Sequence, residues 1–210
     1  MDIIRKEELT QILDEIVTTM EGAKDELIEL DGAMGDGDLG LTMVKGFTAV
    51  AEEIRTLDET DMGKIMMKLG LKMNATAPST MGTLVSTCFL KAAPAAKGKT
   101  ELTLADMVEM GRGAVAGVME RGKSKPGDKI MLDALYPAVE ALGAAAAAGD
   151  SLTDAWQKAY EAAKDGMEKT TSMQSVHGRA AYYQEKSVGR QDPGATAMMY
   201  IVSGIAKAVR

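Results

Sequence analysis

Hydrophobic residues recur at helical spacing along almost the whole chain, and this periodicity constrains the fold more than any other feature. The first such run consists of Ile4, Leu9, Ile12, Leu13, Ile16, Val17 and Met20. Spacing of this kind places the apolar side chains on one face of a helix. No stretch shows the sustained alternation with β-branched residues that is typical of strands. The sequence therefore predicts an all-α protein.

Further helices are expected over about 40–55, 61–76, 80–96, 103–121, 128–148, 151–170 and 195–209. Thr103 with Asp106, and Ser151 with Asp154, have the spacing of capping boxes and mark two helix starts. We find no flexible linker and no internal repeat. The expected organisation is one domain over residues 1–210, a bundle of about eight antiparallel amphipathic helices.

Composition excludes several classes of protein. The 210 residues are 46% hydrophobic and 26% charged, as in soluble globular proteins. The net charge of −7 and the absence of a basic run argue against a nucleic-acid or anionic-membrane partner. No apolar run approaches the ~18 residues that cross a bilayer, and no targeting segment is recognisable. Cys88 is the only cysteine, which fits a reducing compartment and a cytoplasmic location.

The segment from Asp31 to Gly40 joins the first helix to the second and is rich in both acid and glycine. Asp31, Asp36 and Asp38 repel one another unless a cation neutralises them, and the intervening glycines allow a tight loop. Ligands that are all oxygen suit a hard ion such as magnesium or calcium. The segment therefore predicts a site for a divalent metal.

The same segment has two other interpretations, a solvated turn and a calcium loop. A glycine- and aspartate-rich loop taken alone is often only a solvated turn. A calcium loop of the EF-hand type requires a glutamate eleven positions after its first ligand, but Phe47 and Thr42 stand eleven positions after Asp36 and Asp31. The EF-hand motif is therefore excluded, and the prediction of a divalent metal remains.

Three further stretches offer groups that bind phosphate. Hydroxyls lie at a helix start in residues 78–83, and Gly178-Arg179 offers a guanidinium fork. The long polar segment 172–194 ends in Asp192-Pro193-Gly194, just before a last helix whose free amides suit an anion. The connection 122–133 carries three lysines, which either form a solvated loop or contact a nucleotide or partner. Together these parts indicate a site for a metal and a polyphosphate.

The motifs resemble one known family along nearly the whole chain. They are Leu30-Asp31, Gly35-Asp36-Gly37-Asp38 with Gly40, Lys45-Gly46-Phe47, Gly127-Asp128-Lys129, Met131-Leu132-Asp133-Ala134-Leu135, Gly178-Arg179-Ala180, and Gly189 with Gln191-Asp192-Pro193-Gly194-Ala195-Thr196. In their order and spacing they resemble the nucleotide-binding L subunit of the dihydroxyacetone kinase family. The resemblance implies a barrel of eight antiparallel helices with a nucleotide at one end.

The resemblance also implies roles for single residues. Asp31, Asp36 and Asp38 would hold two Mg²⁺ ions on the phosphates of ADP or ATP, and with Arg179 they would form the catalytic set. The remaining expected nucleotide contacts, at phosphate, adenine and the closing turn, are Leu39, Gly40, Thr42, Ser79, Thr80, Met81, Gly122, Met131, Asp192, Pro193 and Gly194.

The chain departs from the family pattern at three places. Leu39 stands where the family often has His, and Thr42 stands where Asn is frequent. Thr80-Met81-Gly82-Thr83-Leu84 replaces a glycine-rich stretch that ends in Ser-Gly-Pro-Leu. A hydroxyl donor to phosphate must then come from Ser79 or Thr80, or be replaced by backbone amides. These changes keep the metal ligands but alter the surroundings of the phosphates and of the acceptor.

The expected function is that of a nucleotide-carrying kinase subunit. It would pass a phosphoryl group to dihydroxyacetone, or a similar short ketose, on a separate K subunit, with a phosphotransferase-system phosphocarrier recharging retained ADP. The alternatives are an ATP-dependent kinase subunit for a tetrose such as erythrulose, a non-enzymatic nucleotide-binding regulator of a transcription factor, and, more weakly, a nucleotide domain like that of fatty-acid kinases. The sequence leaves a homodimer open.

Several conspicuous residues have plainer interpretations. His177, the only histidine, is not needed as a phosphoryl carrier in this mechanism. Cys88 lies among apolar residues and is expected in the core. The same expectation holds for the methionines Met66, Met67, Met73, Met107 and Met110.

Overall fold

The computed structural model describes residues 3–210, and eight α-helices account for most of them. The helices are α1 (Lys6–Gly32), α2 (Leu39–Thr56), α3 (Met62–Thr76), α4 (Thr80–Ala92), α5 (Leu104–Gly122), α6 (Leu132–Ala148), α7 (Leu152–Lys169) and α8 (Pro193–Ala208). Three short 3-10 segments are η1 (Ala93–Ala96), η2 (Thr170–Ser172) and η3 (Arg179–Ser187). Over residues 3–210 the β-structure is limited to an isolated bridge between Ile4 and Leu102.

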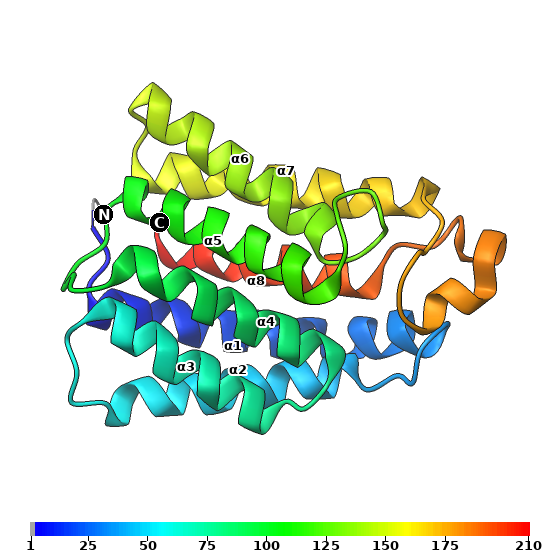
Figure 1. Ribbon diagram of the computed structural model, residues 1–210, viewed down its shortest axis with the longest axis horizontal. Helices are drawn as coiled ribbons and strands as arrows, with labels where there is room; N and C mark the ends of the chain where they lie inside the picture. The colour runs from blue at the N-terminus through cyan, green and yellow to red at the C-terminus, as the bar shows by residue number, and fades with distance from the viewer. Residues whose placement is uncertain (1–2) are drawn as a thin grey trace.

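The helices form a closed ring. Each helix packs against the next in sequence, and α8 packs against α1, so that no helix lies at an open edge (Figure 1). Successive helices run in opposite directions along the long axis. Both termini therefore lie at one end of the ring, while the 33–38 and 173–192 connections lie at the other. The expectation of an all-α barrel of about eight antiparallel helices is confirmed.

The interior of the ring is filled by aliphatic side chains. Its largest fully buried members include Phe47, Leu27, Met20, Met43 and Met73. Flexible methionines fill irregular space between helices, which explains how a core with so few aromatic residues packs.

Cys88 and most of the methionines expected in the core lie in it or against it. Cys88 is partly buried and packs against the core, and burial raises the pKa of its thiol to about 12, so the group is unreactive. Met66, Met73 and Met107 are buried and Met110 is partly buried. The expectation was wrong for Met67, which is 51% exposed on α3.

Three helix boundaries differ from those expected by two residues or more. α6 begins at Leu132, not at 128, because Gly127 and Lys129 have positive φ angles of 94° and 61° that no helix accepts. α4 ends at Ala92 and gives way to η1, which contains Pro94 near its start. α8 begins at Pro193, before the expected Ala195, because Asp192 caps it.

The two predicted capping boxes have different outcomes. Thr103 and Asp106 exchange both hydrogen bonds, as expected. Ser151 accepts a hydrogen bond from the Asp154 amide, but its hydroxyl donates to the Asp154 carboxylate at 2.7 Å, so the reciprocal bond is not formed. The segment 172–194, expected to be a loop, contains η3 and is partly helical.

Gly40 allows α2 to approach α1 closely at the end of the ring that carries the acidic loop. A Cβ atom on Gly40 would lie 2.2 Å from the Lys24 carbonyl oxygen, which belongs to the backbone of α1. We expect Gly40→Ala to cost about 1–3 kcal/mol in the free energy of unfolding, because the backbones must move apart. Gly22→Ala is the control, since its Cβ meets nothing within 4 Å, and it should stabilise by about 0.5–1 kcal/mol. Urea unfolding of both variants measures the difference, and equal effects would contradict the packing argument.

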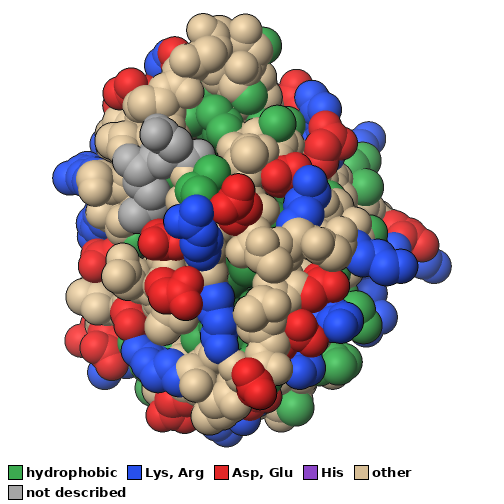
Figure 2. Space-filling view, turned by 90° about the vertical axis from the view of Figure 1, so that its left-hand side faces the viewer, with side chains coloured by type: hydrophobic (Ala, Val, Ile, Leu, Met, Phe, Trp, Pro, Cys, Tyr) green, Lys and Arg blue, Asp and Glu red, His purple; other side chains and the backbone are tan. Residues whose placement is uncertain are grey.

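The end of the ring that carries the termini has a mixed surface. Figure 2 shows acidic and basic side chains interspersed there, without a large area of one sign. Over residues 3–210, no helix combines the length and the apolar character needed to cross a bilayer.

Candidate functional site

A large cavity of about 1290 Å³ opens at the end of the ring opposite the termini. It is lined by the acidic loop after α1, by the starts of α2, α4 and α8, by the turn before α6 and by the segment before α8. The alternating direction of the helices explains this arrangement, because α2, α4, α6 and α8 all begin at this end.

Free backbone amides at these helix starts make the cavity suitable for anions. Ser79 caps α4 by accepting from the Gly82 amide at 3.1 Å, and Asp192 caps α8 by accepting from the Ala195 amide at 2.7 Å. In α4 the amides of Thr80 and Met81 are left without a partner within the helix, whereas at α8 Pro193 has no N–H and the Gly194 amide also faces the Asp192 carboxylate. With the helix dipoles they produce positive potential in the cavity.

Three carboxylates face the same cavity from the acidic loop. One oxygen from each of Asp31, Asp36 and Asp38 can be chosen so that all three lie within 4.8 Å of one another. Asp31 Oδ2 also accepts from the amides of Asp38 at 3.0 Å and Leu39 at 3.3 Å, which fixes its orientation. Gly35 is required here, because a Cβ atom would lie 2.2 Å from Asp31 Oδ1.

The electrostatics of the three carboxylates favour a cation. Burial, followed by the negative charges of Asp36 and Asp31, raises the pKa of Asp38, while Arg179 acts in the opposite direction. A divalent metal would relieve this repulsion, and a set of oxygen donors alone fits Mg²⁺. The residues present therefore fit the expected metal.

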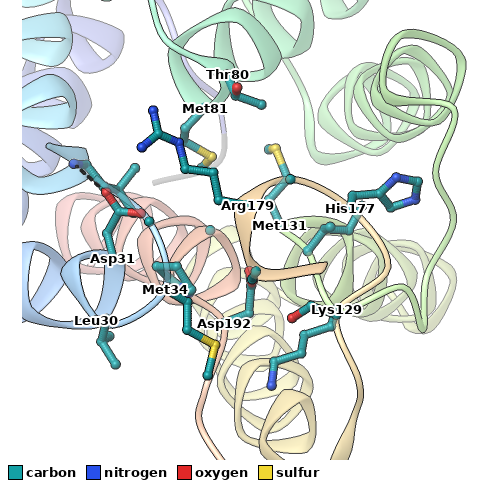
Figure 3. Close-up of a pocket in the computed structure, with 18 of the residues that line it drawn as sticks. Leu30, Asp31, Met34, Thr80, Met81, Lys129, Met131, His177, Arg179 and Asp192 are labelled. Carbon is teal, nitrogen blue, oxygen red and sulfur yellow. Dashed lines mark hydrogen bonds between the residues drawn. The ribbon is translucent and has the colours of Figure 1, made fainter. Parts of the chain in front are cut away.

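Arg179 reaches the acidic loop from the opposite wall of the cavity (Figure 3). Its Nη2 lies 2.8 Å from Asp36 Oδ2, and both side chains are about half exposed. The pairing places a guanidinium group beside the carboxylates, within reach of any phosphate that they hold through a metal. The contact also shows that segment 173–190 folds over the cavity.

The structure brings together most of the residues predicted for the site. The cavity is lined by Asp31, Asp36, Asp38, Leu39, Ser79, Thr80, Met81, Gly122, Met131, Arg179, Asp192, Pro193 and Gly194. Gly40 and Thr42 do not line it: both lie in the first turns of α2, and Gly40 packs on α1. Their contact with a nucleotide stays a prediction.

Sequence reasoning missed the role of residues 127–133. Asp133 turns back to accept from the amides of Gly127 at 2.5 Å and Ile130 at 2.8 Å, which shapes the turn before α6. Lys129, weighed only as a surface or contact lysine, is buried, with its Nζ among backbone carbonyls. The Gly127-Asp128-Lys129 motif could have drawn attention to this turn, but nothing in the sequence shows what its lysine contacts.

His177 has a structural partner. Its Nε2 lies 3.0 Å from Asp128 Oδ2. Burial alone would raise the pKa of Asp128, but hydrogen bonds from His177 and from the Lys125 amide lower it overall. The pair ties the segment before α8 to the turn before α6, and His177 also lines the cavity.

Asp192 gives the protein a pH-dependent stability. Burial raises the pKa of this carboxyl to about 7, against opposing contributions from the Ala195 amide and Lys129, and the charge of Asp133 adds to the rise. A pKa above the unfolded value means that the folded state binds the proton more tightly. The stabilisation is complete below pH 4 and is lost as the pH rises through 7.

We therefore expect Asp192→Asn to gain stability relative to wild type as the pH rises from 4.5 to 8. Asparagine keeps the cap and carries no charge. The slope of the difference should not exceed about 1.4 kcal/mol per pH unit. Urea unfolding of both proteins at pH 4.5, 6 and 8 measures it, and a difference that is independent of pH would contradict a raised pKa.

The known proteins that this chain resembles are kinases, or kinase subunits, named for dihydroxyacetone or D-erythrulose. The chain is 36% identical to the PEP-dependent dihydroxyacetone kinase, ADP-binding subunit DhaL, of Escherichia coli, over 88% of each chain. It is 30% identical to the ADP-binding subunit DhaL of PEP-dependent dihydroxyacetone kinase 1 from Listeria innocua, over 82% of this chain and 81% of the relative. It is also 31% identical to the D-erythrulose kinase of Mycolicibacterium smegmatis, of which it covers only 35%.

Solved structures show the same fold. The native dihydroxyacetone kinase of C. freundii superposes with a TM-score of 0.70 at 25% identity, over 95% of this chain and 34% of the kinase. A second structure of that enzyme, in complex with AMP-PNP and Mg²⁺, gives a TM-score of 0.72 at 24% identity, over 94% of this chain and 33% of the kinase. The chain thus spans about a third of that enzyme. The DAK2 domain family matches residues 33–207, a range that holds all the predicted site residues except Asp31. The chain belongs to the DAK2 domain family.

Proposed function

We propose that this protein is the nucleotide-binding subunit of a dihydroxyacetone kinase, or of a kinase for a similar short ketose. The observation that carries the proposal is the convergence of three carboxylates, an arginine and the starts of α4 and α8 on one cavity. These groups match a nucleoside polyphosphate with its metal. Two relatives that it matches over most of their length are named ADP-binding subunits.

Each group has a part in phosphoryl transfer. Bound Mg²⁺ would neutralise the phosphate oxygens and so lower the barrier to transfer. Asp31, Asp36 and Asp38 would hold the metal, and the free amides at the start of α4 would donate to phosphate oxygens. Arg179 leaves Asp36 for the transferred phosphoryl group and orients it. Gly122 and Met131, which are predicted to hold the adenine, line the same cavity.

The two relatives that this chain matches over most of their length are named as subunits of dihydroxyacetone kinases. This supports a partnership with a K subunit that holds the ketose and that this subunit covers. The cavity is also lined by Glu26, Glu29 and His177, and His177 pairs with Asp128.

The phosphoryl donor is inferred from the names of two relatives. Since the two ADP-binding relatives belong to PEP-dependent kinases, we infer that this subunit retains ADP and is recharged by a phosphotransferase-system phosphocarrier. A tetrose-specific, ATP-dependent role is the second candidate, favoured by the match to D-erythrulose kinase. The homodimer and the cytoplasmic location stay predictions.

The test begins with nucleotide content. Purified protein should release about one ADP per chain when denatured in the presence of a chelator, as measured by mass spectrometry. Incubation with a K subunit, dihydroxyacetone, PEP and the phosphotransferase proteins should then yield ketose phosphate, whereas ATP alone should not. Transfer from ATP to erythrulose would favour the second candidate. Absence of nucleotide binding at any Mg²⁺ concentration would exclude both.

A further inference from the structure

One buried lysine forms hydrogen bonds to both ends of the segment that folds over the cavity. We call residues 173–190 the cap. Lys129 is only 4% exposed, and its Nζ donates to three carbonyl oxygens, of Met173 at 3.1 Å, Ser187 at 2.5 Å and Arg190 at 2.7 Å. Met173 and Arg190 are the two ends of the cap, so a single ammonium group draws both ends together.

The residue beside Lys129 contacts the same segment. The Asp128 carbonyl accepts from the Val176 amide at 3.3 Å, and its carboxylate pairs with His177. The cap has little apolar anchorage of its own: Tyr182 is 89% exposed, and Tyr183, Val176 and Val188 are exposed as well. Polar contacts, not burial of apolar surface, therefore determine where the cap lies: most are with residues 128 and 129, and the Gly189 amide adds one to the Thr171 carbonyl at 2.7 Å.

The backbone conformation and the burial of Lys129 are both unfavourable in free energy, which indicates a functional role for this residue. Its φ angle is 61°, in the left-handed region that non-glycine residues rarely occupy. Burying an ammonium group away from water is also unfavourable, and burial lowers the pKa of Lys129. Three carbonyl oxygens satisfy all three N–H bonds of the ammonium and offset that cost.

The cap carries Arg179, whose guanidinium lies beside Asp36. Arg179 lies six residues after Met173 and eight before Ser187. Lys129 bonds the carbonyls of both of these residues, so Arg179 lies within the stretch that they bound. Lys129 also lines the cavity, and Figure 3 shows it at the lower right of the view, away from Asp31 at the left and from Arg179 above. Lys129 thus lies away from the acidic loop and influences the site through the cap.

We propose that Lys129 is a positioning residue that keeps the cap closed, so that Arg179 faces the metal-binding carboxylates and a bound nucleoside diphosphate leaves slowly. The identity of the ligand rests on the proposed function, but the tether rests on the contacts of Lys129 alone. Without the ammonium, the three carbonyls lose their donors and the ends of the cap separate.

The test uses Lys129→Ala in the full chain, with Lys123→Ala as the matched control. Lys123 also has a positive φ angle, of 48°, but is exposed and does not line the cavity. Amide hydrogen exchange should accelerate in the cap of Lys129→Ala and remain unchanged in the helices. Release of a fluorescent N-methylanthraniloyl-ADP with Mg²⁺, followed by stopped flow, should accelerate at least about tenfold, a change of 1.4 kcal/mol or more.

Chemical rescue separates positioning from general destabilisation. Propylammonium supplied in solution should enter the space left by the lysine and slow both cap exchange and ADP release, whereas neutral 1-propanol at the same concentration should do neither. If Lys129→Ala does not fold, Lys129→Arg replaces it. A planar guanidinium cannot reach three carbonyls as an ammonium does, so intermediate release is expected.

The outcomes are distinct. Unchanged cap exchange in Lys129→Ala, or faster exchange without faster ADP release, would overturn the inference, as would equal rescue by propanol. Failure of the wild-type protein to bind the probe, after its own nucleotide has been removed with a chelator and Mg²⁺ has been restored, would overturn the proposed function. The exchange measurement needs no ligand and judges the tether by itself.

Discussion

Replacing Asp36 with asparagine is expected to reduce phosphoryl transfer at least about 100-fold while leaving the fold intact. The substitution removes one negative oxygen from the cluster of Asp31, Asp36 and Asp38, and metal stabilisation of phosphate charge amounts to several kcal/mol. Asp36 is about half exposed and makes no contact with the core, so unfolding should be little affected. The measurement is ketose phosphate formation with a K subunit as a function of Mg²⁺ concentration.

The variant should need a higher Mg²⁺ concentration for half-maximal activity, because the lost charge weakens metal binding. Asp25→Asn is the control: its side chain is 93% exposed on α1 and lies outside the cavity, so the Mg²⁺ dependence should match wild type. Wild-type activity in Asp36→Asn would show that the carboxylates do not hold the metal.

Replacing Arg179 with alanine is expected to have a second large effect, of about 1,000-fold on the rate of transfer. Arginines that stabilise a transferring phosphoryl group contribute about this much or more. The effect should fall on kcat and leave the Mg²⁺ requirement near that of wild type, because Arg179 is not a metal ligand. Loss of the ion pair also frees Asp36 for the metal.

Two further variants define the role of the guanidinium. Arg179→Lys retains the charge but not the fork, and should recover only a small part of the activity. Lys186→Ala removes a different exposed charge from the cap and should leave the rate unchanged. If Arg179→Ala raised the Mg²⁺ requirement and left kcat intact, Arg179 would be acting on the acidic loop instead of on the phosphoryl group.

The fold and the cluster of three carboxylates could be predicted from the sequence because both depend on local patterns. Helical periodicity gives the same answer over each of the eight helices, and boundaries failed only where a positive φ or a proline intervened, as at Lys129 and Pro94. Asp31, Asp36 and Asp38 are close in sequence, so their convergence needs only a tight loop.

Contacts between distant segments could not be read from the sequence in the same way. Nothing local indicates that Lys129 meets carbonyls at 173, 187 and 190, because backbone carbonyls are the same for every residue. The pairing of Arg179 with Asp36 likewise depends on how the cap folds back, across more than 140 positions. The exposure of Met67 was missed because neighbouring helices, not the residue type, decide which side of α3 is covered.

The closed ring of antiparallel helices has a consequence for how such a domain can be joined to others. An even number of alternating helices returns the chain to the end where it began, so both termini lie a full helix length from the cavity. A flexible connection at either terminus leaves the mouth of the cavity free to meet an acceptor-binding unit. That attachment raises the effective concentration of the two units without altering the site. The D-erythrulose kinase, of which this chain covers about a third, is a single chain in which such a covalent arrangement can operate.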